Sequence, residues 1–229
     1  MGREFELRKE VVLPVSPEEV WAAVATPEGQ AAWFMTGEEI GPGDAETWDP
    51  PRHLAIKTPA GEDGSFHAFE YLIEGREGSA VLRFVHSGMT GDAWPDEYVD
   101  MTGMGWDTYF HSLREYLVHF RGRPAVYVEA EAPSVSVETA AWDRFVAALG
   151  VSEAGDRASI SLPGLPSQEG VVDIIEEGFV GIRTADSLVR FHGRMRLGMP
   201  VAVGHHVYTP IDTDAYTAAW QEWLRSQFA

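Results

Sequence analysis

Apolar and polar side chains alternate at the start of the chain and predict a strand over Phe5–Val12. Glutamates and an arginine occupy one side of this segment, and Lys9 interrupts the other. Four apolar residues share that other side: Phe5, Leu7, Val11 and Leu13. A period of two is typical of a strand with one buried face.

The segment SPEEVWAAVA, directly after this strand, predicts a short helix. Ser16 is typical of a helix N-cap, and Pro17 is typical of the first helical position. The Thr26–Pro27 pair ends the helix, because a proline disfavours the helical conformation in the residue before it. One more turn is expected over Glu28–Trp33, with the indole of Trp33 tucked beneath it.

Residues 36–64 are rich in Gly, Pro and Asp and predict loops, with short edge strands at AETWD and HLAIK. Two stronger strands follow, SFHAFEYLIEG and SAVLRFVHSG, and the turn EGREGS between them predicts a hairpin. Their alternation indicates which side chains share a buried face. These are His67, Phe69, Tyr71 and Ile73 on the first strand and Leu82, Phe84 and His86 on the second.

A long amphipathic helix is predicted over residues 95–121. Two glycines interrupt its first half, Gly103 and Gly105, and each should cost about 1 kcal/mol relative to alanine. The segment RGRP at 121–124 ends the helix and marks a boundary. The apolar stripe falls at helical spacing and consists of Trp106, Tyr109, Phe110, Leu113, Tyr116, Leu117 and Phe120.

The order of elements then repeats. A strand is expected at 125–132, a helix at 137–149 closed by Gly150, and an amphipathic helix at 212–228 that carries Trp220 and Trp223. Between the two helices, strands are expected at 158–162, 171–176, 179–184, 187–192 and 201–208. We therefore predict two α+β domains, 1–122 and 124–229, in which a short Trp-bearing helix covers one end of a sheet.

Composition narrows the classes of partner. The chain of 229 residues has 45% hydrophobic residues and a formal net charge of −19, which would repel nucleic acids and anionic membranes. It has no cysteine, so disulfides, thiol catalysis and Cys-ligated metals are excluded. No apolar run approaches about 20 residues, and the N-terminus lacks a signal-peptide core. We expect a soluble cytoplasmic protein, with no nucleic-acid partner and no membrane insertion.

Motifs for several kinds of chemistry are missing from the sequence. There is no Gly-x-Ser-x-Gly, phosphate-binding loop or dinucleotide fingerprint, and no carboxylate pair stands out as acid and base. The run GHHVY at 204–208 contains adjacent histidines. Because neighbouring strand residues point to opposite faces, these histidines cannot easily share one ion. No metal and no cofactor are predicted.

Three segments in this order resemble the START-like (SRPBCC) superfamily: VVLPVSPEEVWAAVATPEGQAAWF at 11–34, SAVLRFVHSGM at 79–89 and GMGWDTYFHSLREYL at 103–117. Within it, they are similar to bacterial domains like the C-terminal domain of the activator of the ninety-kilodalton heat-shock protein ATPase (Aha1-like). The resemblance covers about half the chain and implies a helix-grip fold, in which a curved antiparallel sheet grips a long C-terminal helix. The second half lacks the Gly-Trp and His-Ser-Gly motifs. It is either a degenerate helix-grip repeat or an appended α+β domain.

The resemblance implies that a small hydrophobic or amphipathic ligand binds in a cavity between sheet and long helix. The alternative is that these aromatic side chains simply fill a core. The residues expected to line the cavity are Trp33, His67, Phe69, Tyr71, Phe84, His86, Trp106, Tyr109 and Phe110. The acidic segment DAWPDEYVD could cover the cavity as a lid or begin the helix.

Two other functions stay open. Some proteins of this fold cyclise or dehydrate polyketides, so a cyclase-, aromatase- or hydrolase-like enzyme could use the same cavity, with His86 or Tyr109 as the acid–base group. The sequence itself assigns no catalytic residue and favours a binding protein over an enzyme. The family resemblance alone also implies a chaperone-associated regulator with a chaperone partner.

Overall fold

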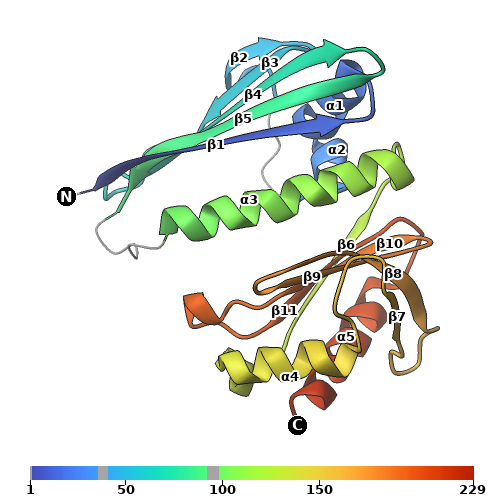
Figure 1. The fold of residues 1–229 in the computed structure, drawn as a ribbon. Coiled ribbons are helices and arrows are strands. Elements are labelled where there is room, and N and C mark those ends of the chain that lie inside the picture. The colour runs from blue at the N-terminus through green and yellow to red at the C-terminus, as the bar shows by residue number, and fades with distance from the viewer. Residues whose placement is uncertain (1, 36–40, 92–97) are drawn as a thin grey trace. The chain divides into compact units, whose positions relative to one another are not determined.

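The computed structural model describes residues 2–35, 41–91 and 98–229 (Figure 1). The chain divides into two compact units, Met1–Gly122 (unit 1) and Arg123–Ala229 (unit 2). Both units combine one antiparallel sheet with helices, so the predicted α+β class is confirmed.

Unit 1 is a five-stranded antiparallel sheet with the strand order β1-β5-β4-β3-β2, so that the last strand pairs with the first. Two short helices follow the first strand, and one long helix follows the last. The elements are β1 (Arg3–Leu13), α1 (Pro17–Ala25), α2 (Pro27–Ala31), β2 (Ala45–Asp49), β3 (His53–Lys57), β4 (Phe66–Arg76), β5 (Ser79–Thr90) and α3 (Tyr98–Glu115). This order is the helix-grip arrangement predicted from the sequence.

Local sequence signals account for the two short helices. The Ser16 hydroxyl accepts a hydrogen bond from the Glu19 backbone N–H at 3.3 Å, and the Ser16 N–H donates to the Glu19 carboxylate at 2.8 Å. This reciprocal capping box satisfies two backbone donors at the start of α1. Thr26 ends α1 and caps α2, because its hydroxyl accepts from the Gly29 N–H at 3.0 Å. Helix α2 ends at Ala31 rather than reaching Trp33.

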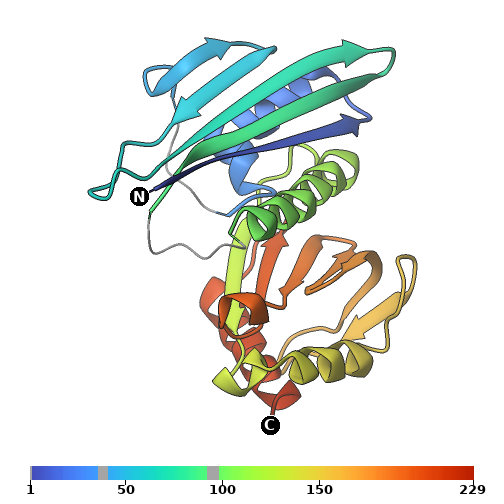
Figure 2. The same cartoon turned by 60° about the vertical axis from the view of Figure 1, so that its left-hand side comes forward.

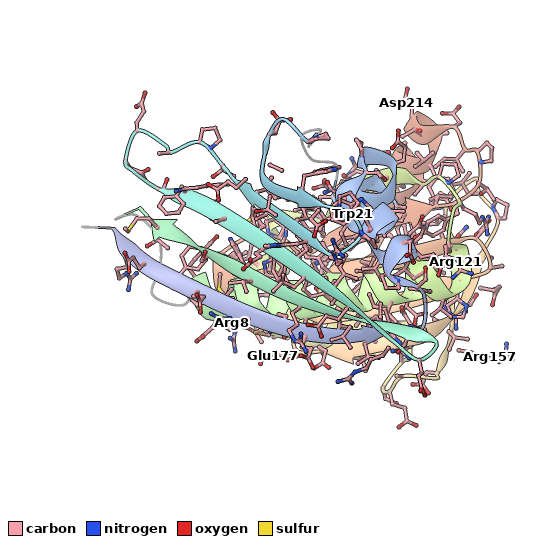
Figure 3. All side chains as sticks on the ribbon, turned by 90° about the horizontal axis from the view of Figure 1, so that it is seen from above. Arg8, Trp21, Arg121, Arg157, Glu177 and Asp214 are labelled. Atoms are coloured by element: carbon pink, nitrogen blue, oxygen red, sulfur yellow. The ribbon has the colours of Figure 1, made fainter. Side chains whose placement is uncertain are left out.

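Helices α1 and α3 cover one side of this sheet, which we call the helix-facing side (Figure 2). Lys9, the polar interruption in the β1 pattern, lies on this side, where its ammonium donates to the Asp107 carboxylate of α3 at 2.7 Å. The opposite side carries exposed charged residues such as Glu6 and Arg8 and is the side viewed in Figure 3. The ion pair thus accounts for a lysine among apolar neighbours.

The long helix differs from its prediction at both ends. Its expected start at residue 95, and residues 92–97 of the possible lid, lie outside the described residues. At the other end the α-helix stops at Glu115 and continues as a π-helical turn, Tyr116–Phe120. Gly122 then takes a positive φ of 75°, and its N–H donates to the Tyr116 hydroxyl at 3.2 Å. The spacing of apolar residues cannot distinguish an α-helix from a π-helical turn here, because Leu117 and Phe120 would be buried in either.

Unit 2 repeats this topology with one more strand. Its sheet has the order β6-β11-β10-β9-β8-β7, and again the last strand pairs with the first. The predicted strands are present, although β8 begins three residues before the expected 171. The elements are β6 (Val126–Glu131), α4 (Thr139–Leu149), β7 (Arg157–Ile160), β8 (Gln168–Glu176), β9 (Phe179–Thr184), β10 (Ser187–His192), β11 (Ala202–Val207) and α5 (Thr213–Gln227).

Helices α4 and α5 cover one side of the unit 2 sheet, and the core of the unit lies between them and the strands (Figure 1). Helix α4 begins at Thr139 rather than at the expected residue 137, and a separate 3₁₀ turn over Ser134–Val137 precedes it. Gly150 closes α4 with a φ of 70°. The Asp212 carboxylate accepts from the Ala215 N–H at 3.1 Å, so Asp212 is the N-cap of α5.

The helices are short or carry charge. α3 has 18 residues, yet it includes Asp100, Asp107 and Arg114. Within the described ranges, none of the helices has both the length and the apolar composition that a membrane span requires.

Candidate functional site

The nine residues predicted to line a ligand site come together on the helix-facing side of unit 1. His67, Phe69 and Tyr71 lie on β4, Phe84 and His86 on β5, and Trp106, Tyr109 and Phe110 on α3, while Trp33 follows α2. Strand register places Tyr71 opposite Phe84 and Phe69 opposite His86. Ring contacts join all nine into one aromatic cluster.

Burial within this cluster falls from one end to the other. Tyr71 and Phe84 are buried, and burial raises the pKa of the Tyr71 phenol. Phe69 and His67 point to the same side of β4 as Tyr71, because they are two and four residues away, yet both are only half-buried. Tyr109 on α3 is half-buried as well. The helix-facing side is therefore partly accessible near His67 and Phe69.

A row of hydrogen bonds links α3 to β5 and β4 inside the cluster. The Trp106 indole N–H donates to Nδ1 of His86 at 3.0 Å, and Nε2 of His86 lies 2.9 Å from Nδ1 of His67. An indole nitrogen can only donate, so Nδ1 of His86 must be the acceptor. The proton of neutral His86 then sits on Nε2 and is donated to Nδ1 of His67. His67 in turn carries its proton on Nε2.

Both imidazoles are held in the neutral form. Burial and, second, the neighbouring His67 lower the pKa of His86 to about 4. Burial also lowers the pKa of His67. Because neither ring is protonated near pH 7, the direction of the hydrogen bonds set by Trp106 is retained there.

Two phenylalanines outside the predicted set complete the packing. The Phe5 ring of β1 meets the His86 ring edge-on at 5.0 Å, and Phe34 lies parallel to Trp106 at 5.6 Å. Trp106 itself reaches the sheet, with its ring 4.3 Å from Phe84. Phe5 was detectable in the sequence, since it shares the buried face of its strand. Phe34 was not, because it lies beyond a helix end where no periodicity applies.

Gly88 lets two strands approach each other at the accessible end of the cluster. It faces Phe5 on one neighbouring strand and His67 on the other. A Cβ atom at this position would lie 2.1 Å from the Phe66 carbonyl oxygen and 3.1 Å from the Phe5 ring. The His-Ser-Gly segment thus has a physical basis: the histidine belongs to the hydrogen-bonded row, and the glycine leaves room for its neighbours.

The two acid–base candidates have different surroundings. His86 is 3% exposed and both of its ring nitrogens are engaged, so a substrate atom could reach it only by displacing Trp106 or His67. Tyr109 is half-buried and packs against Phe34 with ring centroids 4.6 Å apart.

Unit 2 places a second histidine–tryptophan pair in the equivalent positions. His205 lies on the last strand, faces α5, and stands opposite Val128 on β6 and Val189 on β10. Its ring is 5.3 Å from that of Trp220 on α5, whereas the adjacent His206 contacts Tyr127 on the other side of the sheet. The predicted opposite orientation of the two histidines is confirmed. The pairing of His205 with Trp220 was missed, because it joins residues 15 positions apart on different elements.

Among known proteins, the chain is similar to solved structures but to no family model or curated sequence. The crystal structure of DynU16, from the dynemicin biosynthetic locus, is 15% identical and covers 97% of this chain and 95% of its own, with a TM-score of 0.40. An AHSA1-like protein from Rhizobium etli is 25% identical over 53% of this chain and 86% of its own, with a TM-score of 0.39.

The Aha1 dimer from Colwellia psychrerythraea is 16% identical over 49% of this chain and 96% of its own, with a TM-score of 0.39. Independently of these similarities, unit 1 has the order of strands and helices that the sequence predicts for a helix-grip fold.

Proposed function

We propose that this START-like chain binds a small hydrophobic or amphipathic molecule on the helix-facing side of unit 1, at the end where the aromatic cluster is half-buried. The observation that carries the proposal is the hydrogen-bonded row from buried Trp106 through His86 to half-buried His67. A buried row of polar groups destabilises the fold unless each group has a hydrogen-bond partner. This row ends at His67, beside apolar rings that are partly accessible.

The apolar part of the ligand would contact Phe69, Phe34 and Tyr109. These rings are half-buried although they belong to the packed side of the unit. Small-molecule sites commonly combine aromatic walls with a few directed polar groups. The accessible end of the cluster has both features.

The polar part of the ligand would be oriented by His67. The row fixes the proton of this imidazole on Nε2, so the ring offers a donor there and suits a carbonyl or hydroxyl oxygen. Because the pKa of His67 is lowered by burial, this recognition would operate with a neutral imidazole at pH 7 and would favour an uncharged group.

Thermal unfolding of the full chain with a library of lipophilic molecules tests the proposal. A ligand that binds the folded state raises Tm according to RT ln(1 + [L]/Kd). We expect Phe69→Ala to abolish the shift. Phe66→Ala on the same strand should retain it, because Phe66 lies three residues away on the other side of the sheet, under Lys57. Failure of several hundred compounds to shift Tm, with no cargo in native mass spectrometry, would exclude ligand binding.

An enzyme using the same residues is the second candidate. The specific observation in its favour is the direct contact of two imidazoles, His86 and His67, through which a proton could pass in either direction. An enzyme would convert the bound molecule. Tyr109→Phe or His86→Ala would then abolish turnover and spare binding.

A chaperone-associated role is the third candidate, and it rests on the family resemblance alone. Co-purification of the full chain with a chaperone, without any effect of lipophilic ligands, would favour it over the first two. A cytoplasmic location fits all three functions and is proposed with them.

A further inference from the structure

The two hydrogen bonds of the unit 1 row use every acceptor that a neutral histidine pair offers. His86 and His67 have two ring nitrogens each, and in the neutral form each ring carries one proton and one acceptor nitrogen. Nδ1 of His86 accepts from the Trp106 indole at 3.0 Å, and Nδ1 of His67 accepts from Nε2 of His86 at 2.9 Å. A further proton would leave the pair with a single acceptor nitrogen, so one of the two hydrogen bonds would have to break.

Charge decides which of the two bonds is lost. The positive charge is least costly on His67, because this ring is half-buried whereas His86 is 3% exposed. A hydrogen bond from the charged His67 to His86 is about twice as strong as one between neutral groups. Keeping that bond requires Nε2 of His86 as the acceptor, so the proton of His86 moves to Nδ1. There it faces the indole N–H of Trp106, and two donors cannot bond each other.

The groups around the pair show what governs its protonation. On the helix-facing side of β1, the Lys9 ammonium is already paired with the Asp107 carboxylate of α3 at 2.7 Å. The Tyr98 phenol of α3 has its pKa raised by burial, so it stays neutral in acid. Burial lowers the pKa of both histidines, and His67 lowers that of His86 further, to about 4. Among the described residues, the sheet rings that contact the pair cannot titrate: Phe5 on β1, Phe69 on β4 and Phe84 on β5.

We propose that the row is a pH-sensitive switch in the attachment of α3 to the sheet. With the neutral pair, the Trp106 indole is hydrogen-bonded to β5. With one added proton, it keeps only ring contacts such as that with Phe84 at 4.3 Å. Gly103 and Gly105 weaken the helix beside Trp106, because each costs about 1 kcal/mol relative to alanine. The hydrogen bond is thus lost where α3 is least rigid. The switch goes beyond the proposed ligand binding, because it operates with or without a bound molecule.

The indole N–H signal of Trp106 in the ¹⁵N-labelled full chain gives a direct test between pH 7 and pH 4. The chain has eight tryptophans, and Trp106→Phe identifies the signal by its loss. Triple-resonance spectra assign it if that variant does not fold. We expect the signal to move, as the pH falls, toward the position of an indole without a hydrogen bond, in the same step in which the ring ¹⁵N signals of His67 report protonation. The Trp33 signal should stay in place, because its N–H donates to the Ala23 carbonyl at 2.9 Å.

His67→Gln separates the switch from a general effect of acid. The amide oxygen still accepts from His86, but the side chain cannot be protonated. The charge would then have to reside on the buried His86, so the change in the Trp106 signal should move to lower pH by about one unit or more. His53→Gln is the matched control on the opposite side of the same sheet, where His53 bonds Glu70, and should leave the Trp106 transition unchanged.

Three results would overturn the proposal. The first is a Trp106 signal that stays in place while His67 becomes protonated, and the second is an unchanged transition in a folded His67→Gln protein. The third is joint loss of the Trp33 and Trp106 signals with the circular dichroism of the fold, because acid would then unfold the chain before the switch operates. If His67→Gln does not fold, the wild-type titration decides by the first and third results. Since no ligand is added, these results are independent of the ligand binding proposed for unit 1.

Discussion

Trp106 and His86 are joined by a hydrogen bond of 3.0 Å that determines where the protons of the unit 1 site lie. Because the indole only donates, it fixes the tautomer of His86 and, through the next hydrogen bond, that of His67. A residue of the long helix thus sets which atom of a half-buried histidine on β4 is presented as a donor. The effect passes through two strands of the sheet.

Replacing Trp106 by phenylalanine should leave the tautomers of His86 and His67 no longer fixed. The variant keeps an aromatic ring beside Phe84 but leaves Nδ1 of His86 without its donor. Losing a partner of a buried polar atom costs about 1–3 kcal/mol, so the free energy of unfolding in urea should fall by about that amount. Long-range ¹⁵N–¹H spectra should show a mixture of tautomers for His86 where the wild type has Nε2–H alone.

Trp48→Phe is the matched control, since it makes the same chemical change at a half-buried residue of the edge strand β2. It should change the free energy of unfolding by less than about 0.5 kcal/mol and leave the His86 tautomer unchanged. A Trp106→Phe protein with wild-type stability and a pure Nε2–H tautomer would contradict the role of Trp106.

Acid should destabilise the protein through its buried histidines. The pKa of His86 is about 4 in the folded state against an ordinary 6.5, so the unfolded chain binds more protons between these values. The free energy of unfolding should therefore be constant above pH 6.5 and decrease as the pH falls toward 4. Its slope is about 1.4 kcal/mol per pH unit for each such histidine.

His205 adds to this loss, because its pKa is lowered to about 3. Urea unfolding between pH 4 and 7 should show a shallower dependence for His205→Leu than for the wild type, by about the contribution of one histidine. A curve for His205→Leu that runs parallel to the wild-type curve over this pH range would contradict the assignment.

Two glycines of unit 1 should respond to alanine in opposite directions. At Gly88 the added methyl group would lie 2.1 Å from the Phe66 carbonyl oxygen, so β4 and β5 must separate. The free energy of unfolding should fall by about 2 kcal/mol or more. At Gly105, inside α3, an added methyl group would have no atom within 4 Å apart from the backbone of the helix itself. Alanine should therefore stabilise the helix by about 1 kcal/mol. Thermal and urea unfolding of both variants measure this contrast.

Separate expression tests whether each unit is an independent domain. Two hydrogen bonds next to the boundary each join residues of one unit: the Gly122 N–H donates to the Tyr116 hydroxyl, and the Arg123 guanidinium donates to the Tyr208 carbonyl at 2.8 Å. We expect the fragments 1–122 and 123–229 each to unfold cooperatively with dispersed NMR spectra. A fragment that binds hydrophobic dyes and lacks near-ultraviolet circular dichroism would indicate a shared core.

Much of the fold could be predicted because its signals are local. The period of two predicted β1, β4 and β5, the period of 3.6 predicted α3 and α5, and Ser16 marked the start of α1 by its capping chemistry. The π-helical turn after Glu115 could not be predicted, because its apolar spacing is compatible with an α-helix. The first three residues of β8, QEG at 168–170, were also missed, because apolar and polar side chains do not alternate there.

The candidate residues could be predicted as a set but not as an arrangement. The sequence by itself determined that His67, His86 and Trp106 belong to buried faces, because burial follows from periodicity along one element. Only the tertiary structure decided that they form a hydrogen-bonded row and that His205 and Trp220 stand in the same positions without one. Strand register and the placement of a helix on a sheet are set by contacts between segments far apart in the chain, and no local pattern records them.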